Sequence, residues 1–262
     1  MDKNKLSTDA DRMIGSYIDF RIGNARTGIP YFNNKIGRAR GGERARVGKG
    51  SPKDILEELE IILVKGHVAK DSLSDEALKK ILVDNNLGID CSGFAYYVLD
   101  SENRARGHGH INRRMTFLKG KNPVAKMFSY LRPAQNCDVR AFASDMNSRI
   151  IALKNAQAGD IITMIDSGDA SERAERNHII VITEVVQESG ETKSLSYAHA
   201  IAYPEDGLYG SGVKQGKIDI AYAGEALTKQ LWSESGSPDK AKRIFERALA
   251  STTELRRLKW LS

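Results

Sequence analysis

The chain has 262 residues, of which 40% are hydrophobic, so it is long and apolar enough to bury a full core. Its formal net charge is +6, and with only two cysteines, Cys91 and Cys137, it is not a scaffold held by several disulfides. No apolar run approaches the roughly 18–20 residues of a membrane helix, and no apolar leader follows Met1. We therefore expect a protein made in the cytoplasm, with non-classical secretion as the alternative.

The first third of the chain has mainly helical patterns. Residues 8–23 begin with a capping sequence and carry apolar residues at helical spacing, which predicts a first helix. A connection rich in Gly and Arg follows over 24–50. Its tract Gly48-Lys49-Gly50-Ser51 lacks the glycine spacing and the preceding strand of a phosphate-binding loop. Further helices are predicted over 51–66 and 74–87, and nothing in either suggests chemistry.

Cys91 stands where a turn becomes a helix. Gly88 breaks the preceding element, Asp90 can act as the N-cap, and apolar residues then recur at helical spacing from Phe94. In the first turn of a helix, unpaired backbone N–H groups and the macrodipole favour a thiolate, which lowers the thiol pKa from about 8.5. The same N–H groups can bind an oxyanion. The alternative is a buried cysteine that packs as a small hydrophobic residue.

The segment after this helix is basic. Residues 101–149 hold ten Lys or Arg and only three acidic residues, so this segment can attract an anionic polymer, while a solvated surface is the alternative. His108-Gly109-His110 has no further ligand at metal-binding spacing, so we predict no metal site. A short helix is predicted over 124–131. Cys137 has no helix start or base nearby, so we interpret it as structural.

The second half of the chain predicts strands that can supply a base for the thiol. A turn precedes a strand over 161–165, and the β-branched run 177–186 is followed by a hairpin turn and a returning strand over 192–200. His178 and His199 are then directly opposite if the loop is Glu188-Ser189 or 187–190, and diagonal neighbours if it is Ser189-Gly190. In both registers they share one face of the sheet. Further on, 217–222 and 253–261 predict strands, and Ser237 begins a helix.

These residues resemble the NlpC-type cell-wall cysteine peptidases, a papain-like family. The family's nucleophile sequence Asp-Cys-Ser-Gly-Phe matches Asp90 to Phe94, and its Pro-Gly-Asp-Leu strand entry is similar to Ala158-Gly159-Asp160-Ile161. Its catalytic His opens a strand, as His178 does, and its third polar residue, often in a His-Ala pair, is similar to His199-Ala200. The order and approximate spacing match over residues 87–200.

The resemblance implies the fold and the domain organisation. We expect an α+β, papain-like domain over residues 1–262, in which the nucleophile helix packs on an antiparallel sheet. The family also carries a Gly-x-Pro-Tyr segment whose tyrosine lines the site, and Gly28-Ile29-Pro30-Tyr31 is similar to it. That segment stands far upstream of the cysteine, so a long insertion must intervene. We place a helical insertion at about 33–86 and a basic-loop insertion at about 101–150.

The resemblance also implies a thiol-dependent hydrolase that cleaves amide bonds in peptidoglycan stem peptides, such as one following D-glutamate. In this mechanism Cys91 attacks the carbonyl, His178 accepts the thiol proton and later protonates the leaving amine, and His199 orients the imidazole. The backbone N–H of Cys91 binds the oxyanion, with Ser92 and Asp90 as supporting residues. Tyr31 is a further supporting residue by the same resemblance. No metal or organic cofactor is implied.

Two other classes of function fit the sequence. One is a papain-like amidase or acyltransferase that acts on a cytoplasmic substrate through the same thioester. The other is an inactive peptidase scaffold that binds an anionic polymer, either wall material or nucleic acid, although nucleic acid is the less expected partner. The sequence does not distinguish hydrolysis from acyl transfer, and it does not give the bond cleaved or the oligomeric state.

Overall fold

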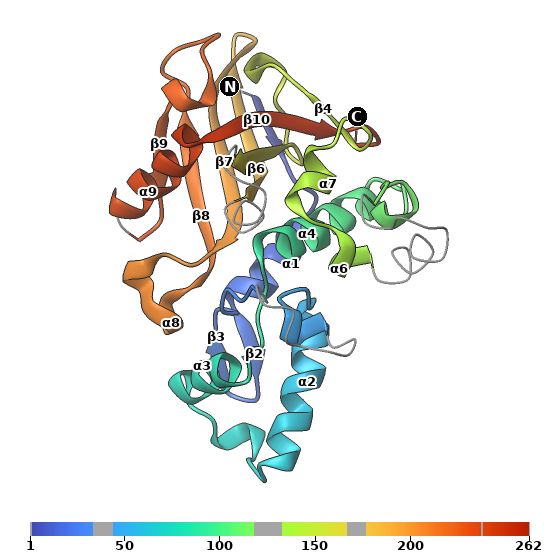
Figure 1. Cartoon of the computed structure of the whole chain (residues 1–262), viewed down its shortest axis with the longest axis vertical. Helices are drawn as coiled ribbons and strands as arrows, with labels where there is room; N and C mark the ends of the chain where they lie inside the picture. The colour runs from blue at the N-terminus through green and yellow to red at the C-terminus, as the bar shows by residue number, and fades with distance from the viewer. Residues whose placement is uncertain (1, 34–43, 118–132, 167–176, 237, 262) are drawn as a thin grey trace.

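The computed structural model describes residues 2–33, 44–117, 133–166, 177–236 and 238–261 (Figure 1). It is an α+β structure built on an eight-stranded, antiparallel sheet, which confirms the expected class at this level. The strands are β1 Asp2–Lys5, β4 Ser148–Ile150, β5 Ile161–Asp166, β6 His178–Glu188, β7 Glu191–Ile201, β8 Gly212–Asp219, β9 Leu231–Glu234 and β10 Ser251–Leu258. The helices are α1 Thr8–Ile18, α2 Pro52–Lys65, α3 Asp75–Asp84, α4 Cys91–Ala105, α6 Pro133–Asn136, α7 Val139–Ala143, α8 Gly207–Gly210 and α9 Pro238–Leu249. Within the described ranges, none of the helices combines the length and the apolar character needed to cross a bilayer.

The strand order in the sheet is β4-β10-β5-β6-β7-β8-β9. The long strand β6 has two neighbours on one side, because β5 pairs with its first residues, 178–181, and β1 pairs with residues 184–187. In Figure 1, β10 runs across the view whereas β7 and β8 run along it, so the sheet is strongly twisted. The start of β6, where His178 lies, is therefore a central position and not an edge of the sheet.

The β6–β7 hairpin has the two-residue loop Ser189-Gly190, which is one of the predicted registers. Both loop residues have positive φ, 50° and 80°, as a tight hairpin turn requires. The pairing shifts by one residue at two places along the hairpin, and the two shifts cancel. Val181 pairs with Ala198, so His199 is opposite residue 180 and is the diagonal neighbour of His178. The two histidines share a face, as predicted.

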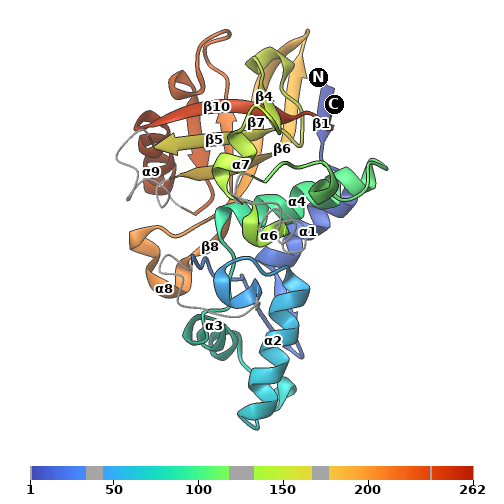
Figure 2. The same cartoon turned by 45° about the vertical axis from the view of Figure 1, so that its right-hand side comes forward.

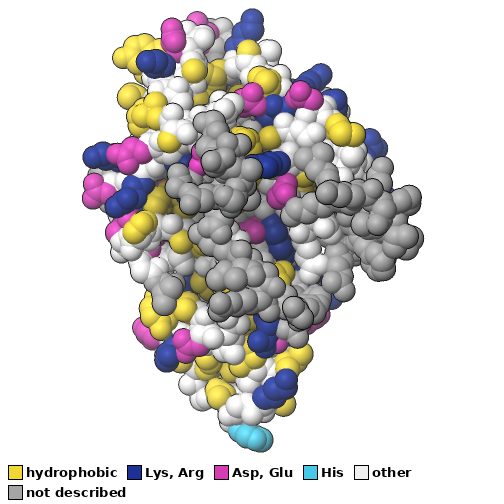
Figure 3. Space-filling model, in the orientation of Figure 1, with side chains coloured by type: hydrophobic (Ala, Val, Ile, Leu, Met, Phe, Trp, Pro, Cys, Tyr) yellow, Lys and Arg dark blue, Asp and Glu magenta, His cyan; other side chains and the backbone are white. Residues whose placement is uncertain are grey.

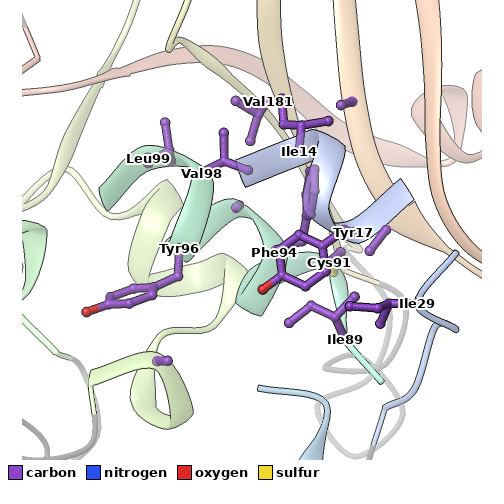
Figure 4. Close-up of a cluster of buried hydrophobic side chains, with 14 of the residues drawn as sticks. Ile14, Tyr17, Ile29, Ile89, Cys91, Phe94, Tyr96, Val98, Leu99 and Val181 are labelled. Atoms are coloured by element: carbon purple, nitrogen blue, oxygen red, sulfur yellow. The ribbon is translucent and has the colours of Figure 1, made fainter. Parts of the chain in front are cut away.

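Helix α4 lies against one face of this sheet. It packs on α1 and on strands β6 and β7. Figure 4 shows the resulting cluster of buried side chains, in which Cys91 and Phe94 of α4 lie with Tyr17 of α1 and Val181 of β6. The predicted packing of the nucleophile helix on an antiparallel sheet is thus observed. The opposite face of the sheet is covered by α9, whose Ile244 and Ala248 are buried there.

The helices α2 and α3 form a lobe at the end of the molecule away from the sheet (Figures 1 and 2). Each begins with a serine cap, and Ser51 and Asp54 form a complete capping box at the start of α2. Their buried residues belong to the same apolar cluster as α4. Both helices fall within the range 33–86, where an insertion stays a prediction and of which 34–43 lie outside the described residues. The predicted basic insertion includes 118–132, and with it the helix predicted over 124–131, which also lie outside them.

Some sequence-based boundaries were wrong, and one strand was not predicted. The first helix ends at Ile18 instead of continuing to residue 23, because Phe20–Ile22 form strand β2, paired with β3 Ala25–Thr27. Phe20 and Ile22 are buried, and Arg21 between them is exposed. This alternation has the period of two of a strand and not the 3.6-residue period of a helix. The strand predicted to begin at residue 217 begins at Gly212, and the polar residues 2–5 form strand β1.

Candidate active site

Asp90 and Cys91 form the start of α4 as predicted. The Asp90 carboxylate accepts the backbone N–H of Gly93 at 2.6 Å, and Cys91 is the first helical residue. The backbone N–H groups of Cys91 and Ser92 have no hydrogen-bond acceptor among the described residues. They are therefore free to bind a negatively charged oxygen that forms next to the thiol.

The Cys91 thiol lies beside the first peptide group of β6. Cys91 is 6% exposed, and the backbone N–H of Ile179 is close enough to its sulfur to lower the thiol pKa. That N–H belongs to the peptide that joins His178 to Ile179, so the thiol and the His178 ring flank the same stretch of backbone. The hydrogen bonds of the described residues do not include one between the thiol and the imidazole. Transfer of the thiol proton to His178 therefore requires the two side chains to approach each other when a substrate binds.

Three side chains form a buried relay that ends at His178. The His178 Nε2 and His199 Nδ1 atoms are 2.6 Å apart, and the His199 Nε2 atom is 3.0 Å from a carboxylate oxygen of Glu234. His178 is 1% exposed and His199 is fully buried. Glu234 was not predicted, because the short strand β9 that carries it has no clear pattern in the sequence.

The carboxylate at the end of the relay stays ionised. Burial acts to raise the pKa of Glu234, but hydrogen bonding and attraction from His199, together with the hydroxyls of Tyr203 and Tyr197, lower it below its ordinary value. Tyr203 donates to one carboxylate oxygen at 2.7 Å and Tyr197 to the other at 3.2 Å. Glu234 is therefore an acceptor only, and it accepts three hydrogen bonds.

This acceptor determines which ring nitrogens carry protons. His199 must donate from Nε2 to Glu234, so a neutral His199 accepts at Nδ1. His178 then donates from Nε2 to His199, which leaves the lone pair of His178 at Nδ1. Burial and the neighbouring His199 and Arg247 keep the pKa of His178 well below its usual value. His178 is thus a neutral base with its free lone pair on Nδ1.

The thiol is protonated in the free protein, contrary to the sequence-based expectation. Burial raises the pKa of Cys91 to about 11, and the Asp90 carboxylate also raises it. The charges of Lys49 and Arg247 and the N–H of Ile179 lower it without outweighing burial. The expectation was wrong because it considered the helix start alone, whereas the tertiary structure removes the thiol from water. The resting pair is a neutral thiol and a neutral imidazole.

The pH dependence of alkylation tests this protonation state. In a Cys137→Ser background, we expect the reaction of Cys91 with iodoacetamide to rise with pH to an inflection near 11. Because an ordinary thiol has a pKa of about 8.5, the thiolate fraction at pH 7 is then about 300-fold lower than that of a free cysteine. Rates would be measured by mass spectrometry of the Cys91 peptide. An inflection at or below pH 8.5 would contradict this assignment.

Lys49 supports the start of the nucleophile helix, which the sequence did not indicate. Its buried ammonium group donates to Asp90 Oδ1 at 2.9 Å, to Ser92 Oγ at 2.5 Å and to the Cys137 carbonyl at 3.1 Å. Burial acts to lower the pKa of Lys49, but attraction to Asp90 raises it above the ordinary value, so Lys49 remains charged. The Ser92 hydroxyl also donates to Asp90, at 3.1 Å. The side chains of Asp90 and Ser92 therefore hold the helix start in place, and only backbone groups face an oxyanion.

Tyr31 lies within electrostatic reach of the thiol although it is 60 residues upstream of it. It forms an isolated parallel bridge with Ile89, whose N–H donates to the Pro30 carbonyl at 3.1 Å. A Cβ atom on Gly88 would be 2.6 Å from that carbonyl, so only glycine allows this close approach. Burial and then the Cys91 charge raise the pKa of the Tyr31 phenol. The segment that contains α2 and α3 thus runs between Tyr31 and Ile89, which pair with each other.

The side chains of His110 and Cys137, which were also considered in the sequence, contact residues outside the relay. No group of three or more His, Cys, Asp or Glu residues that could hold a metal ion exists within the described part of the chain. His110 instead pairs with Asp100, at 2.9 Å between Nδ1 and Oδ2. Cys137 is fully buried, and its thiol contacts the Met115 sulfur at 3.7 Å.

Comparisons with other proteins do not add to this description. The sequence matches no model of a known family and no curated protein, and the fold matches no solved structure. The function therefore has to be argued from the site itself.

Proposed function

We propose that this chain is a cysteine hydrolase that cleaves amide bonds through a thioester on Cys91. The observation that carries the proposal is the buried relay of Glu234, His199 and His178, which leaves a basic nitrogen on the first residue of β6, next to Ile179, whose N–H is close to the thiol. A nucleophile, a base and an orienting group are the three components that covalent amide hydrolysis needs. A purely structural pair of histidines has no need of a thiol at a helix start beside it.

The reaction follows from the assigned protons. As the thiol sulfur attacks the amide carbon, the thiol proton moves to Nδ1 of His178, and the carbonyl oxygen becomes an oxyanion held by the N–H groups of Cys91 and Ser92. The resulting imidazolium is stabilised through His199 by the Glu234 carboxylate. His178 then protonates the leaving amine, the thioester forms, and a water activated by His178 releases the acid.

The substrate class rests on the resemblance of Asp90 to Phe94, His178 and His199 to the NlpC-type cell-wall peptidases. It suggests peptidoglycan stem peptides, with cleavage after D-glutamate. The test is incubation of the protein with the tripeptide L-alanyl-γ-D-glutamyl-meso-diaminopimelate, with products identified by mass spectrometry. Release of free diaminopimelate supports the proposal, and an intact peptide after prolonged incubation with folded protein contradicts it.

The one face drawn in Figure 3 gives the polymer-binding alternative little support. On the face seen in Figure 3, Lys and Arg side chains are interspersed with Asp and Glu among the described residues. Binding of an anionic polymer requires a patch of Lys and Arg side chains without acidic side chains among them. We therefore place hydrolysis first.

A further inference from the structure

Arg247 lies at the end of α9 that is close to the candidate site. Two residues after α9, Ser251 of β10 pairs with Asp166, the last residue of β5. The backbone N–H of Asp166 donates to the side chain of Asn177 at 2.9 Å, and Asn177 directly precedes His178. The end of α9 and the start of β6 therefore meet at the same end of the sheet.

Arg247 is the exception among the basic side chains along this helix. Lys240, Lys242 and Arg243 each form an ion pair with a carboxylate. Arg247 is half-buried, yet it makes no hydrogen bond or ion pair with any residue that the structure describes. A charge removed in part from water usually has a partner, so this guanidinium is available to an anionic ligand.

The charge of Arg247 acts on the reacting groups. Burial has the largest effect on the pKa of each of Cys91, His178 and Tyr31, and in all three the positive charge of Arg247 lowers the pKa. The guanidinium therefore lies within electrostatic reach of the nucleophile, the base and the tyrosine beside them. The second cation near the thiol, Lys49, is fully occupied by protein acceptors.

We propose that Arg247 binds a carboxylate of the substrate next to the amide that Cys91 attacks. A guanidinium binds a carboxylate through two parallel hydrogen bonds, which fixes both the position and the orientation of the ligand. This inference rests on the proposed hydrolase function and adds a substrate class: an acyl group with a free carboxylate near the scissile carbonyl. D-glutamate linked through its γ-carboxyl carries such a group, its α-carboxylate.

Two peptides that differ in one group test the proposal. One is L-alanyl-γ-D-glutamyl-meso-diaminopimelate, and in the other the α-carboxylate of D-glutamate is an uncharged amide. Each is assayed with wild type, Arg247→Gln and the matched control Arg243→Gln, which removes an exposed guanidinium of the same helix. For Arg247→Gln we expect kcat/KM to fall about 10–100-fold on the carboxylate peptide and less than about threefold on the amide peptide. Equal losses on both peptides, no loss on either, or the same loss in Arg243→Gln would overturn the proposal.

A binding measurement separates this inference from the proposed function. Calorimetry with Cys91→Ala compares the affinity of the two peptides with and without Arg247→Gln, and it needs no turnover. If Arg247→Gln weakens binding of the carboxylate peptide alone, the inference is supported even where wild type cleaves neither peptide and the hydrolase proposal fails. If both peptides bind equally well with and without Arg247, the inference is wrong even where cleavage is observed.

Discussion

Cys91→Ala is expected to lower kcat on the stem peptide by about 10⁴-fold or more, because it removes the thiol at the unpaired N–H groups of α4, and the neighbouring Ser92 hydroxyl is hydrogen-bonded to Asp90 and Lys49. His178→Ala is expected to cause a loss of similar size, since the two side chains act as a unit and their effects do not add. The double variant should therefore be no less active than either single variant. Activity would be measured as release of diaminopimelate.

The controls for this prediction are structural. Cys137→Ser should retain wild-type activity, because it changes only the thiol, which contacts Met115, and keeps the Cys137 carbonyl that Lys49 binds. Cys91→Ala removes one sulfur atom from the start of α4, and circular dichroism and the melting temperature should show that the fold is kept. Undiminished turnover by folded Cys91→Ala would contradict the assignment of the nucleophile.

Glu234→Gln is expected to lower kcat by about 10²–10⁴-fold while the protein stays folded. Glu234 accepts hydrogen bonds from His199, Tyr197 and Tyr203, and glutamine offers only one oxygen in place of two. If the glutamine amide N–H donates to His199 Nε2, that nitrogen has to accept, and the proton of a neutral His199 moves to Nδ1. It would thereby reverse the His178–His199 hydrogen bond and place a proton on the Nδ1 atom that has to act as the base.

The matched control for Glu234→Gln is Tyr203→Phe. It removes one donor to the same carboxylate and leaves the bond from Glu234 to His199 intact. A loss of less than about tenfold is expected, because the proton positions in the relay do not change. If Tyr203→Phe lowers kcat as much as Glu234→Gln does, Glu234 acts through packing and not through the relay.

The parts of the site that depend on local sequence were predictable. The cap at Asp90 and the helix from Cys91 depend on adjacent residues, and the shared face of His178 and His199 follows from strand alternation around a short loop. The antiparallel sheet and the helix packed on it were also expected. The papain-like assignment remains a proposal.

The parts that depend on tertiary packing were not predictable. Lys49, Glu234 and Arg247 come from a loop, a four-residue strand and a distant helix, and no spacing in the sequence links them to Cys91. The error in the thiol pKa has the same origin, since burial of Cys91 depends on elements far away in the chain. Tyr31 could be proposed only from the family resemblance, because it reaches the site through its pairing with Ile89.

Trapping of an acyl-enzyme tests the central claim most directly. The protein is mixed with the stem peptide, quenched in acid and digested, and the Cys91 peptide is examined by mass spectrometry. We predict an added mass equal to the L-alanyl-γ-D-glutamyl group on Cys91, which hydroxylamine removes and which is absent from His178→Ala. Cleavage of the peptide without any adduct on Cys91, or with the adduct on another residue, would contradict the account.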